Sequence, residues 1–338
     1  MKAVGYAKSL PVTDPEVLVD FTTETPAPGA RDLRVAVKAV SVNPVDTKVR
    51  IRAQPRPGEP PKILGYDAAG VVEAIGPDVT LFKPGDEVFY AGSITRPGTN
   101  SELHLVDERI VGRKPKSLSF AQAAALPLTS ITAWEMLFDR FGVVPGKTPD
   151  GRALLIIGGA GGVGSIMIQL ARRLTALTVI ATASRKETRD WCLKLGADHV
   201  IDHSKPLADQ LKAVGHPQVA LIAGISGTET SFPQVEAIIA PQGKFALIDD
   251  PKSLDIMPLK RKAASVHWES MFTRAIFQTP DMIAQHKLLN EVSAMIDGGL
   301  IVTTAAQEFA PINAANLIKA HAQIESGTTI GKVVLSGW

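Results

Sequence analysis

The 338 residues of this chain, 45% hydrophobic and 21% charged, exceed what one hydrophobic core usually organises, so we expect two domains. A balance of 36 lysine and arginine against 34 aspartate and glutamate residues leaves a net charge of +2, which argues against a nucleic-acid or membrane-surface partner. No apolar run approaches the ~18 residues of a membrane span, and the N-terminus lacks the apolar core of a signal peptide, so we expect a cytoplasmic protein without a membrane partner.

Residues 1–125 alternate between apolar and polar positions and are punctuated by glycine and proline, which is typical of strands and turns. Strands are predicted at residues 33–40, 70–76 and 86–90. This block predicts a β-rich, barrel-like domain.

The pattern changes after Ser119, where helices and buried strands begin to alternate. A helix is predicted over 132–141, and the apolar run 153–157 predicts a buried strand. Further strands are predicted at 177–182, 199–201, 219–223, 244–248 and 331–335, and helices at 186–195, 207–214 and 280–296. Repeated strand–helix units imply a parallel sheet with helices on both faces. The predicted fold class is therefore α/β, with a Rossmann doubly wound parallel sheet inserted into a β-rich domain.

A glycine-rich segment follows the strand at 153–157 and opens an amphipathic helix. Gly159, Gly161 and Gly164 stand in the G-x-G-x-x-G register. The first glycine permits a tight turn, the second lets the backbone approach a pyrophosphate, and the third lets the helix pack on the strand. The other members of the loop are Ala160, Gly162 and Val163. A strand, a glycine turn and a helix N-terminus in this order predict a dinucleotide-binding site.

The end of the next strand indicates which dinucleotide is bound. NAD-selective sites place Asp or Glu there, roughly 20 residues beyond the glycines, to bind the ribose 2′-hydroxyl. This chain has Ser184, Arg185 and Lys186 instead. A hydroxyl and two cations suit a 2′-phosphate, which a carboxylate would repel, so we predict NADPH. The alternative is a solvated helix start that carries ordinary surface charge.

Cys192 is the only cysteine of the chain. One cysteine cannot form an intramolecular disulfide, and it cannot supply the several thiolates of a structural zinc site. It lies in an apolar helical stretch, so we interpret it as a packing residue rather than a nucleophile.

Several motifs, spread over nearly the whole chain, resemble those of the medium-chain dehydrogenase/reductase superfamily. They are 41–47 (SVNPVDT), 65–70 (GYDAAG), 83–88 (KPGDEV), 126–134 (LPLTSITAW) and 331–335 (GKVVL). The chain is most similar to the NADPH:quinone oxidoreductase (zeta-crystallin-like) branch and to proteins labelled zinc-type alcohol dehydrogenase-like. This resemblance implies a GroES-like catalytic domain at residues 1–126 and 270–338 and a Rossmann domain at 127–269. It also implies a homodimer joined at the sheet edge near 265–268.

The resemblance also shows which metal ligands this chain lacks. Zinc-dependent relatives hold catalytic zinc with Cys, His and Cys, and the corresponding positions here are Asn43, Tyr66 and Leu128. An amide, a phenol and an aliphatic side chain cannot replace those ligands. We therefore expect no bound metal.

Candidate catalytic residues come from the same part of the chain. Asn43 would donate a hydrogen bond to the acceptor or to the cofactor ribose, or would hold its own Asn-Pro turn. Tyr66 would present its hydroxyl to the substrate, or would be buried with its hydroxyl bonded to the backbone. Lys48 stands where quinone reductases often carry tyrosine. It would be a proton donor or an anion anchor, or a solvated surface lysine.

Four further positions are expected near the cofactor. By analogy with related proteins, Thr129 and Thr132 would contact the nicotinamide from the start of a helix, and an N-capping role is the alternative for both. His203 follows a predicted strand and would lie beside the adenosine phosphate. Ile248 opens the loop that would border the nicotinamide.

The absence of zinc ligands limits the chemistry that the sequence predicts. Alcohol oxidation without a Lewis acid is difficult, whereas hydride donation to an electron-poor acceptor needs less stabilisation of charge by the protein. We therefore predict an NADPH-dependent reductase of quinones or α,β-unsaturated carbonyls that works without a metal. Two alternatives stay open: a zinc-dependent alcohol dehydrogenase, and a non-catalytic NADPH-binding protein.

Overall fold

The computed structural model describes residues 1–149 and 151–338, which divide into two compact units. The first unit comprises Met1–Ile131 and Phe272–Trp338, and the second comprises Thr132–Met271. The domain boundaries expected after residues 126 and 269 stay predictions. No helix in the described residues is long and apolar enough to cross a membrane.

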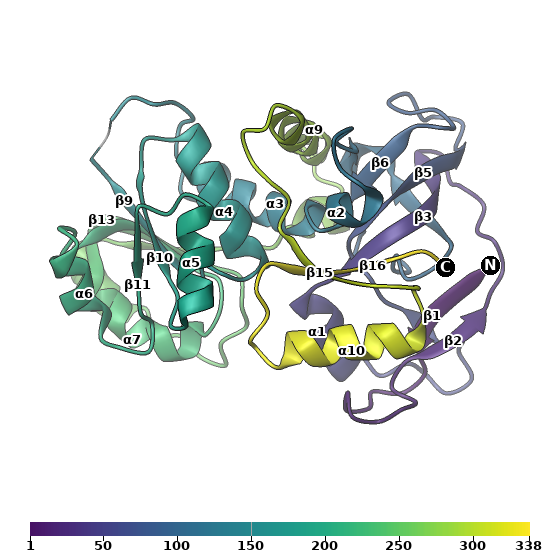
Figure 1. The fold of residues 1–338 in the computed structure, drawn as a ribbon, viewed down its shortest axis with the longest axis horizontal. Helices are drawn as coiled ribbons and strands as arrows, with labels where there is room; N and C mark the ends of the chain where they lie inside the picture. Colours follow the sequence, from purple (N-terminus) through teal and green to yellow (C-terminus); the bar gives the residue numbers. More distant parts are fainter. Residues whose placement is uncertain (150) are drawn as a thin grey trace. The chain divides into compact units, whose positions relative to one another are not determined.

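The first unit is built mainly from antiparallel strands (Figure 1). Its strands are β1 (Lys2–Tyr6), β2 (Val19–Thr22), β3 (Asp32–Val42), β4 (Lys62–Ile63), β5 (Ala68–Ile75), β6 (Glu87–Tyr90), β7 (Leu103–Asp107), β8 (Val111–Arg113), β15 (Ala305–Phe309) and β16 (Lys332–Ser336). Its helices are α1 (Pro44–Arg52), η1 (Glu108–Ile110), α2 (Phe120–Ala124), α8 (Thr273–Phe277), α9 (Ala284–Asp297) and α10 (Ala314–Glu325). The strands predicted at 33–40, 70–76, 86–90 and 331–335 are confirmed as β3, β5, β6 and β16.

Strand β3 organises the larger sheet of this unit, whose order is β15-β16-β3-β5-β6-β8, with β7 also paired to β3. Its first half alternates between buried and half-buried residues, and its last four residues are all buried. Antiparallel pairing sets Val42, at the end of β3, opposite Val333, near the start of β16. The residues that follow β3 and those that begin β16 therefore lie side by side, although they are far apart in the sequence. A smaller sheet has the order β2-β1-β4.

The second unit is an α/β sandwich of parallel strands and helices. Its strands are β9 (Ala153–Ile157), β10 (Thr178–Thr182), β11 (His199–Ile201), β12 (Val219–Gly224), β13 (Ile239–Leu247) and β14 (Ser265–Trp268). Its helices are the π-helix η2 (Glu135–Arg140), α4 (Gly162–Leu174), α5 (Lys186–Lys194), α6 (Leu207–Ala213), α7 (Thr228–Ile238) and η3 (Met257–Lys262). The division between the units falls inside α3 (Pro127–Trp134).

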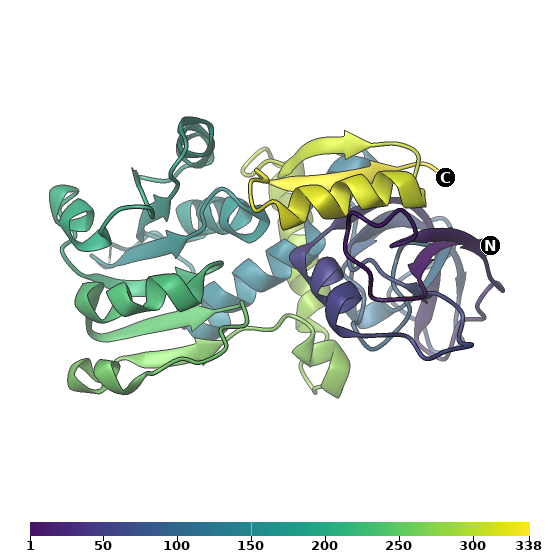
Figure 2. The same cartoon turned by 90° about the horizontal axis from the view of Figure 1, so that it is seen from below.

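The parallel sheet has the strand order β11-β10-β9-β12-β13-β14. With β9 as the first strand, this is the order 3-2-1-4-5-6 of dinucleotide-binding folds, which reverses direction beside β9. All five residues of β9 are buried, and Leu155, Ile222 and Phe245 join one core across the central strands. Helix α4 packs against β9 and β10, and α6 lies beside α7 (Figures 1 and 2). The predicted fold class, a Rossmann sheet combined with a β-rich domain, is confirmed.

Three predicted elements differ from the observed ones. The helix expected over 132–141 begins earlier, as α3 (Pro127–Trp134), and continues as the π-helix η2. The helix expected from residue 280 begins at Ala284, because residues 279–282 form a turn in which the Met282 amide donates to the Thr279 carbonyl. The strand expected at 244–248 is longer, since β13 already begins at Ile239.

Candidate active site

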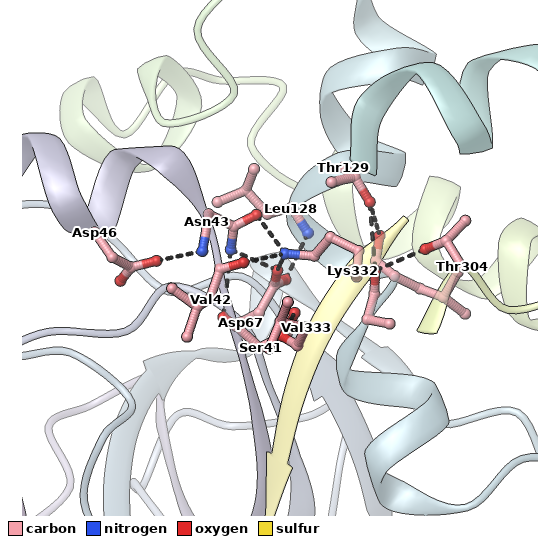
Figure 3. Close-up of polar contacts among 12 residues, drawn as sticks. Ser41, Val42, Asn43, Asp46, Asp67, Leu128, Thr129, Thr304, Lys332 and Val333 are labelled. Atoms are coloured by element: carbon pink, nitrogen blue, oxygen red, sulfur yellow. Dashed lines mark hydrogen bonds and ion pairs between the residues drawn. The ribbon is translucent and has the colours of Figure 1, made fainter. Parts of the chain in front are cut away.

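Asn43 lies at the centre of a buried polar cluster in the first unit (Figure 3). It connects β3 to α1 in an extended conformation, which the following Pro44 favours. Its side-chain Nδ2 donates to Asp67 Oδ2 at 2.7 Å and more weakly to the Ser41 carbonyl at 3.4 Å. Its Oδ1 accepts from Lys332 Nζ at 2.6 Å. Both ends of the amide are thus engaged within the protein.

Lys332 supplies the cation of this cluster. Its Nζ lies 2.8 Å from the Val42 carbonyl, 2.6 Å from Asn43 Oδ1 and 3.3 Å from Asp67 Oδ2, which matches the three donors of an ammonium group. The side chain is only 3% exposed. Burial lowers the pKa of Lys332, and the neighbouring carboxylates of Asp67 and Asp46 oppose that shift. Lys332 is buried because β16 pairs with the buried end of β3.

Two carboxyl groups complete the cluster, and each accepts a hydrogen bond at both oxygens. Asp67 Oδ1 accepts from the Leu128 amide at 2.8 Å, while its Oδ2 faces Asn43 and Lys332. Asp46 accepts from the Asn43 amide at 2.7 Å and from the Gly65 amide at 2.9 Å. Burial raises the pKa of both groups, that of Asp46 to about 7, against the opposing effect of their hydrogen bonds and of Lys332.

The other predicted residues of this unit lie around the cluster. Tyr66 is buried, and its ring meets Phe272 edge-on with centroids 5.4 Å apart. Burial raises the pKa of Tyr66 well above its usual value, and the charge of Asp46 adds to the shift. Lys48 lies half-buried on α1. Thr129 is buried in α3, where its hydroxyl donates to the Leu126 carbonyl at 3.2 Å instead of capping the helix.

The donor set of this cluster does not fit a zinc ion. Zinc sites in proteins use thiolate, imidazole and carboxylate ligands in tetrahedral geometry. Here the Asn43 oxygen is bound to the Lys332 ammonium, and Leu128 contributes its backbone amide. In the part of the chain that the structure describes, no group of three His, Cys, Asp or Glu side chains could hold a metal ion.

The glycine loop of the second unit connects β9 to α4. The left-handed backbone of the turn falls on Gly158, with φ +95°, one residue before Gly159. Gly159 is instead constrained by space, because a Cβ there would lie 2.7 Å from the Ala181 Cβ. A Cβ on Gly164 would lie 2.4 Å from the Gly158 carbonyl oxygen, which explains why helix and loop can approach so closely.

Gly161 differs from these glycines because it faces open space. A Cβ there would meet only the Gly158 carbonyl oxygen, at 3.7 Å. Gly161 is the N-cap residue of α4. The first backbone amides of this helix therefore lie next to a residue with open space around it. That is the arrangement that a helix N-terminus needs in order to bind a phosphate. Ala160 and Val163 are buried, and Gly162 is the first residue of α4.

The remaining cofactor candidates follow the carboxyl ends of the strands. The Gly158 amide donates to Thr182 Oγ1 at 3.0 Å, which joins the glycine loop to the end of β10. Ser184 and Arg185 come next and are exposed. Lys186 is also exposed, but its Nζ pairs with Asp190 at 2.6 Å along α5. The structure thus brings the predicted 2′-phosphate residues to the same sheet edge as the loop.

His203 and Ile248 lie at opposite parts of this edge. His203 is exposed in the turn after β11, beside the end of β10. Ile248 follows β13, and its amide donates to the Gly224 carbonyl at 3.3 Å. Thr132 is buried in α3, at the start of this unit.

Two family models match the chain in the regions that these observations mark. The alcohol dehydrogenase GroES-like domain matches residues 29–128, and the zinc-binding dehydrogenase family matches residues 162–284. A β-rich GroES-like domain combined with a dinucleotide-binding sheet defines a two-domain oxidoreductase.

Known proteins narrow this class to one family. The chain is 42% identical to a zinc-type alcohol dehydrogenase-like protein of Staphylococcus aureus, over 99% of this chain and 100% of the relative. It matches the solved structure of a Rhizobium etli protein, provisionally described as a zinc-dependent alcohol dehydrogenase, with TM-score 0.96 and 59% identity, over 100% of this chain and 98% of the other. Escherichia coli quinone oxidoreductase, solved with NADPH, matches with TM-score 0.84 and 26% identity, over 99% and 100%. The chain belongs to the medium-chain dehydrogenase/reductase superfamily, which confirms the resemblance of its motifs, and it is an oxidoreductase.

Proposed function

We propose that this oxidoreductase transfers a hydride from NADPH to quinones or α,β-unsaturated carbonyl compounds without using a metal ion. The observation that carries the proposal is the set of side chains at the positions where zinc-dependent relatives hold their metal. An amide, a phenol and an aliphatic side chain stand there, and the buried cation beside them is the ammonium of Lys332.

This donor set suits reduction of a conjugated acceptor. An alkoxide formed from a saturated alcohol needs strong stabilisation at neutral pH, which a metal ion supplies efficiently as a Lewis acid. In a quinone or an enone, by contrast, the incoming negative charge spreads over a conjugated oxygen, and a few fixed hydrogen-bond donors can stabilise it. NADPH would supply the hydride, and the protein would orient the reactants and exclude water.

Tyr66 is the donor that we assign to the developing oxyanion. Because burial holds the pKa of Tyr66 far above neutral, its hydroxyl keeps its proton and can donate it in a hydrogen bond. Asn43 would position the surrounding loop, since its amide is engaged by Asp67 and Lys332. Lys48, on the helix that starts after Asn43, would attract an anionic acceptor or return a proton to it.

NADPH is the proposed cofactor because Ala183, Ser184 and Arg185, and no carboxylate, directly follow β10. Ser184 and Arg185 are exposed there, and an arginine–phosphate pair is a strong, geometrically specific contact. A similar solved protein, the Escherichia coli quinone oxidoreductase, carries NADPH. Thr129, Thr132, His203 and Ile248 stay candidates for the rest of the cofactor.

Replacement of Arg185 by alanine tests the choice of cofactor. We expect R185A to raise the Kd for NADPH about 10- to 100-fold and to leave the Kd for NADH nearly unchanged, because one charged hydrogen-bond pair is lost. K194A is the matched control, since Lys194 is an exposed cation at the other end of α5. Equal losses for both nucleotides in R185A would contradict the assignment to the 2′-phosphate.

We further infer a homodimer that forms through β14. In the described chain β14 is the last strand of the parallel sheet, and it pairs only with β13. Trp268, at its end, is 61% exposed. An open strand edge can pair with the same edge of a second copy. Light scattering that gives the mass of a monomer would contradict this inference.

The direct test of the proposed function is a panel of acceptors. NADPH oxidation would be followed with quinones, enones and saturated aldehydes at equal concentrations. We expect turnover with the first two classes and little with the third. No acceleration by any acceptor, in a protein that binds NADPH, would instead support the non-catalytic binding protein.

A further inference from the structure

The second unit contains a buried pair of carboxyl groups that the proposed chemistry has not used. Glu135 lies in the π-helix η2 and is 1% exposed, and Glu269 directly follows β14 and is 4% exposed. Arg140, one turn beyond Glu135, donates from Nε to Glu269 Oε2 at 2.8 Å. Glu135 and Glu269 are themselves hydrogen-bonding neighbours through their side chains.

The hydrogen bonds of this pair are incomplete unless a proton is present. Glu269 Oε1 is buried and accepts no hydrogen bond from a donor of the described protein. Its neighbour, the carboxyl group of Glu135, can donate only when one of the two groups is protonated. Two adjacent carboxylates cannot both ionise easily, and burial makes this harder. One shared proton would join the two groups and leave a single negative charge for Arg140 to balance.

The surroundings of the pair favour this protonated state. Burial raises the pKa of Glu269 to about 9, the charge of Glu135 adds to the shift, and Arg140 opposes it. Two other titratable groups come from the neighbouring strands. His267 on β14 has its pKa lowered by burial, and the Lys244 ammonium on β13 donates to the Phe141 carbonyl at 2.7 Å.

The pair also lies at the edge of the sheet where a dinucleotide binds. The Glu269 amide donates to the carbonyl of Leu247, the last residue of β13, at 3.0 Å. In doubly wound sheets the dinucleotide lies across the carboxyl ends of the strands, on both sides of the reversal in strand order. The 2′-phosphate residues lie beside β10 on one side of β9, so the nicotinamide half falls on the side of β12, β13 and β14.

We propose that Glu135 and Glu269 hold one proton between them and release it when the nicotinamide is oxidised. The proposal rests on the proposed function and names a proton site for it. Reduction of the acceptor takes a hydride from NADPH and a proton from the medium, and the nicotinamide ring becomes positively charged. A nearby positive charge favours the ionised form of a carboxyl pair. The proton that leaves the pair can therefore supply the one consumed, and the pair regains a proton from water when NADP⁺ leaves.

Linkage gives this proposal a consequence for binding alone. If bound NADP⁺ weakens the binding of the proton by the pair, loss of that proton must strengthen the binding of NADP⁺, relative to NADPH, by the same factor. The ratio of the Kd of NADP⁺ to that of NADPH should therefore fall about 10-fold as the pH rises from 6 to 10. Both nucleotides carry the same 2′-phosphate, so its own titration cancels in the ratio.

The experiment measures both Kd values over this pH range for the native protein, E269Q and the control E236Q, whose side chain is exposed on α7. We expect the 10-fold change in the native protein and in E236Q, and a ratio independent of pH in E269Q. A native ratio that does not change with pH, or an E269Q ratio that changes like the native one, would overturn the proposal. If E269Q does not fold, E135Q and direct measurement of proton release on NADP⁺ binding to the native protein serve the same purpose.

Because no acceptor takes part, this experiment is separate from the test of turnover. A protein that shows the expected pH dependence but reduces no acceptor would retain the proton site and lose the proposed function. A protein that reduces enones, but whose ratio of the two Kd values does not depend on pH, would retain the proposed function and lose the proton site.

Discussion

The two units each bury a cluster of charged groups, and the clusters differ in how completely their carboxyl oxygens are bonded. In the first unit both oxygens of Asp67 receive donors, from Leu128 on one side and from Asn43 and Lys332 on the other. In the second unit Glu269 Oε2 receives Arg140, while Oε1 receives no donor. The carboxyl groups of Asp67 and Glu269 are similarly buried, so the two clusters differ in the number of hydrogen-bond donors that reach the carboxyl oxygens. The first cluster holds the residues that follow β3 in place, whereas the second has a carboxyl oxygen that can still take up a proton.

Loss of Lys332 should give the largest effect, because it breaks the fully bonded cluster. K332A leaves Asp67 buried without its cation, and removing one partner of a buried ion pair costs about 3–5 kcal/mol of stability. Urea unfolding measures this loss. K38A, at an exposed position of β3, is the control and should change stability by less than about 0.5 kcal/mol. A loss as small as that in K332A would mean that the cluster is not structurally important.

Truncation of Asn43 should have a smaller effect on the same cluster. N43A removes a donor to Asp67 and an acceptor for Lys332, but the direct ion pair at 3.3 Å remains. The unsatisfied groups should cost about 1–3 kcal/mol. If N43A proved as costly as K332A under the same conditions, the amide and not the ammonium would hold the cluster together.

The effect of the carboxyl pair should be visible only as a dependence of stability on pH. The folded pKa of Glu269 lies above its unfolded value, so stability falls as the pH rises toward the folded pKa of about 9. E269Q removes this titration. From pH 6 to pH 9 its stability should improve relative to the native protein by up to about 4 kcal/mol, since one proton taken up on folding changes the stability by ~1.4 kcal/mol per pH unit. Parallel Tm curves for the two proteins, measured by circular dichroism, would refute a shared proton.

The sequence predicted local features well and missed contacts between distant segments. The strand, glycine turn and helix from Ala153 to Leu174 are continuous in the sequence, so their pattern was visible. The contact between Lys332 and Asn43 joins residues 289 positions apart. A lysine at the start of a strand suggests an exposed position, and only the pairing of β16 with β3 buries it.

The carboxyl pair was missed for a related reason. Glu135 stands between Trp134 and Met136, and a single carboxyl group in an apolar helical run is a weak signal. Its meaning depends on Glu269, which the fold brings to it from the end of β14. The strand order of the sheet, and not any local motif, creates the pair.

The central claim is that hydride transfer proceeds without a metal ion, and one measurement addresses it directly. The purified protein would be dialysed against a strong chelator, analysed for metals, and assayed for NADPH-dependent reduction of an enone before and after addition of Zn²⁺. We expect unchanged turnover in a preparation free of zinc and no stimulation by added Zn²⁺. Activity that disappears on chelation and returns with one Zn²⁺ per subunit would contradict it.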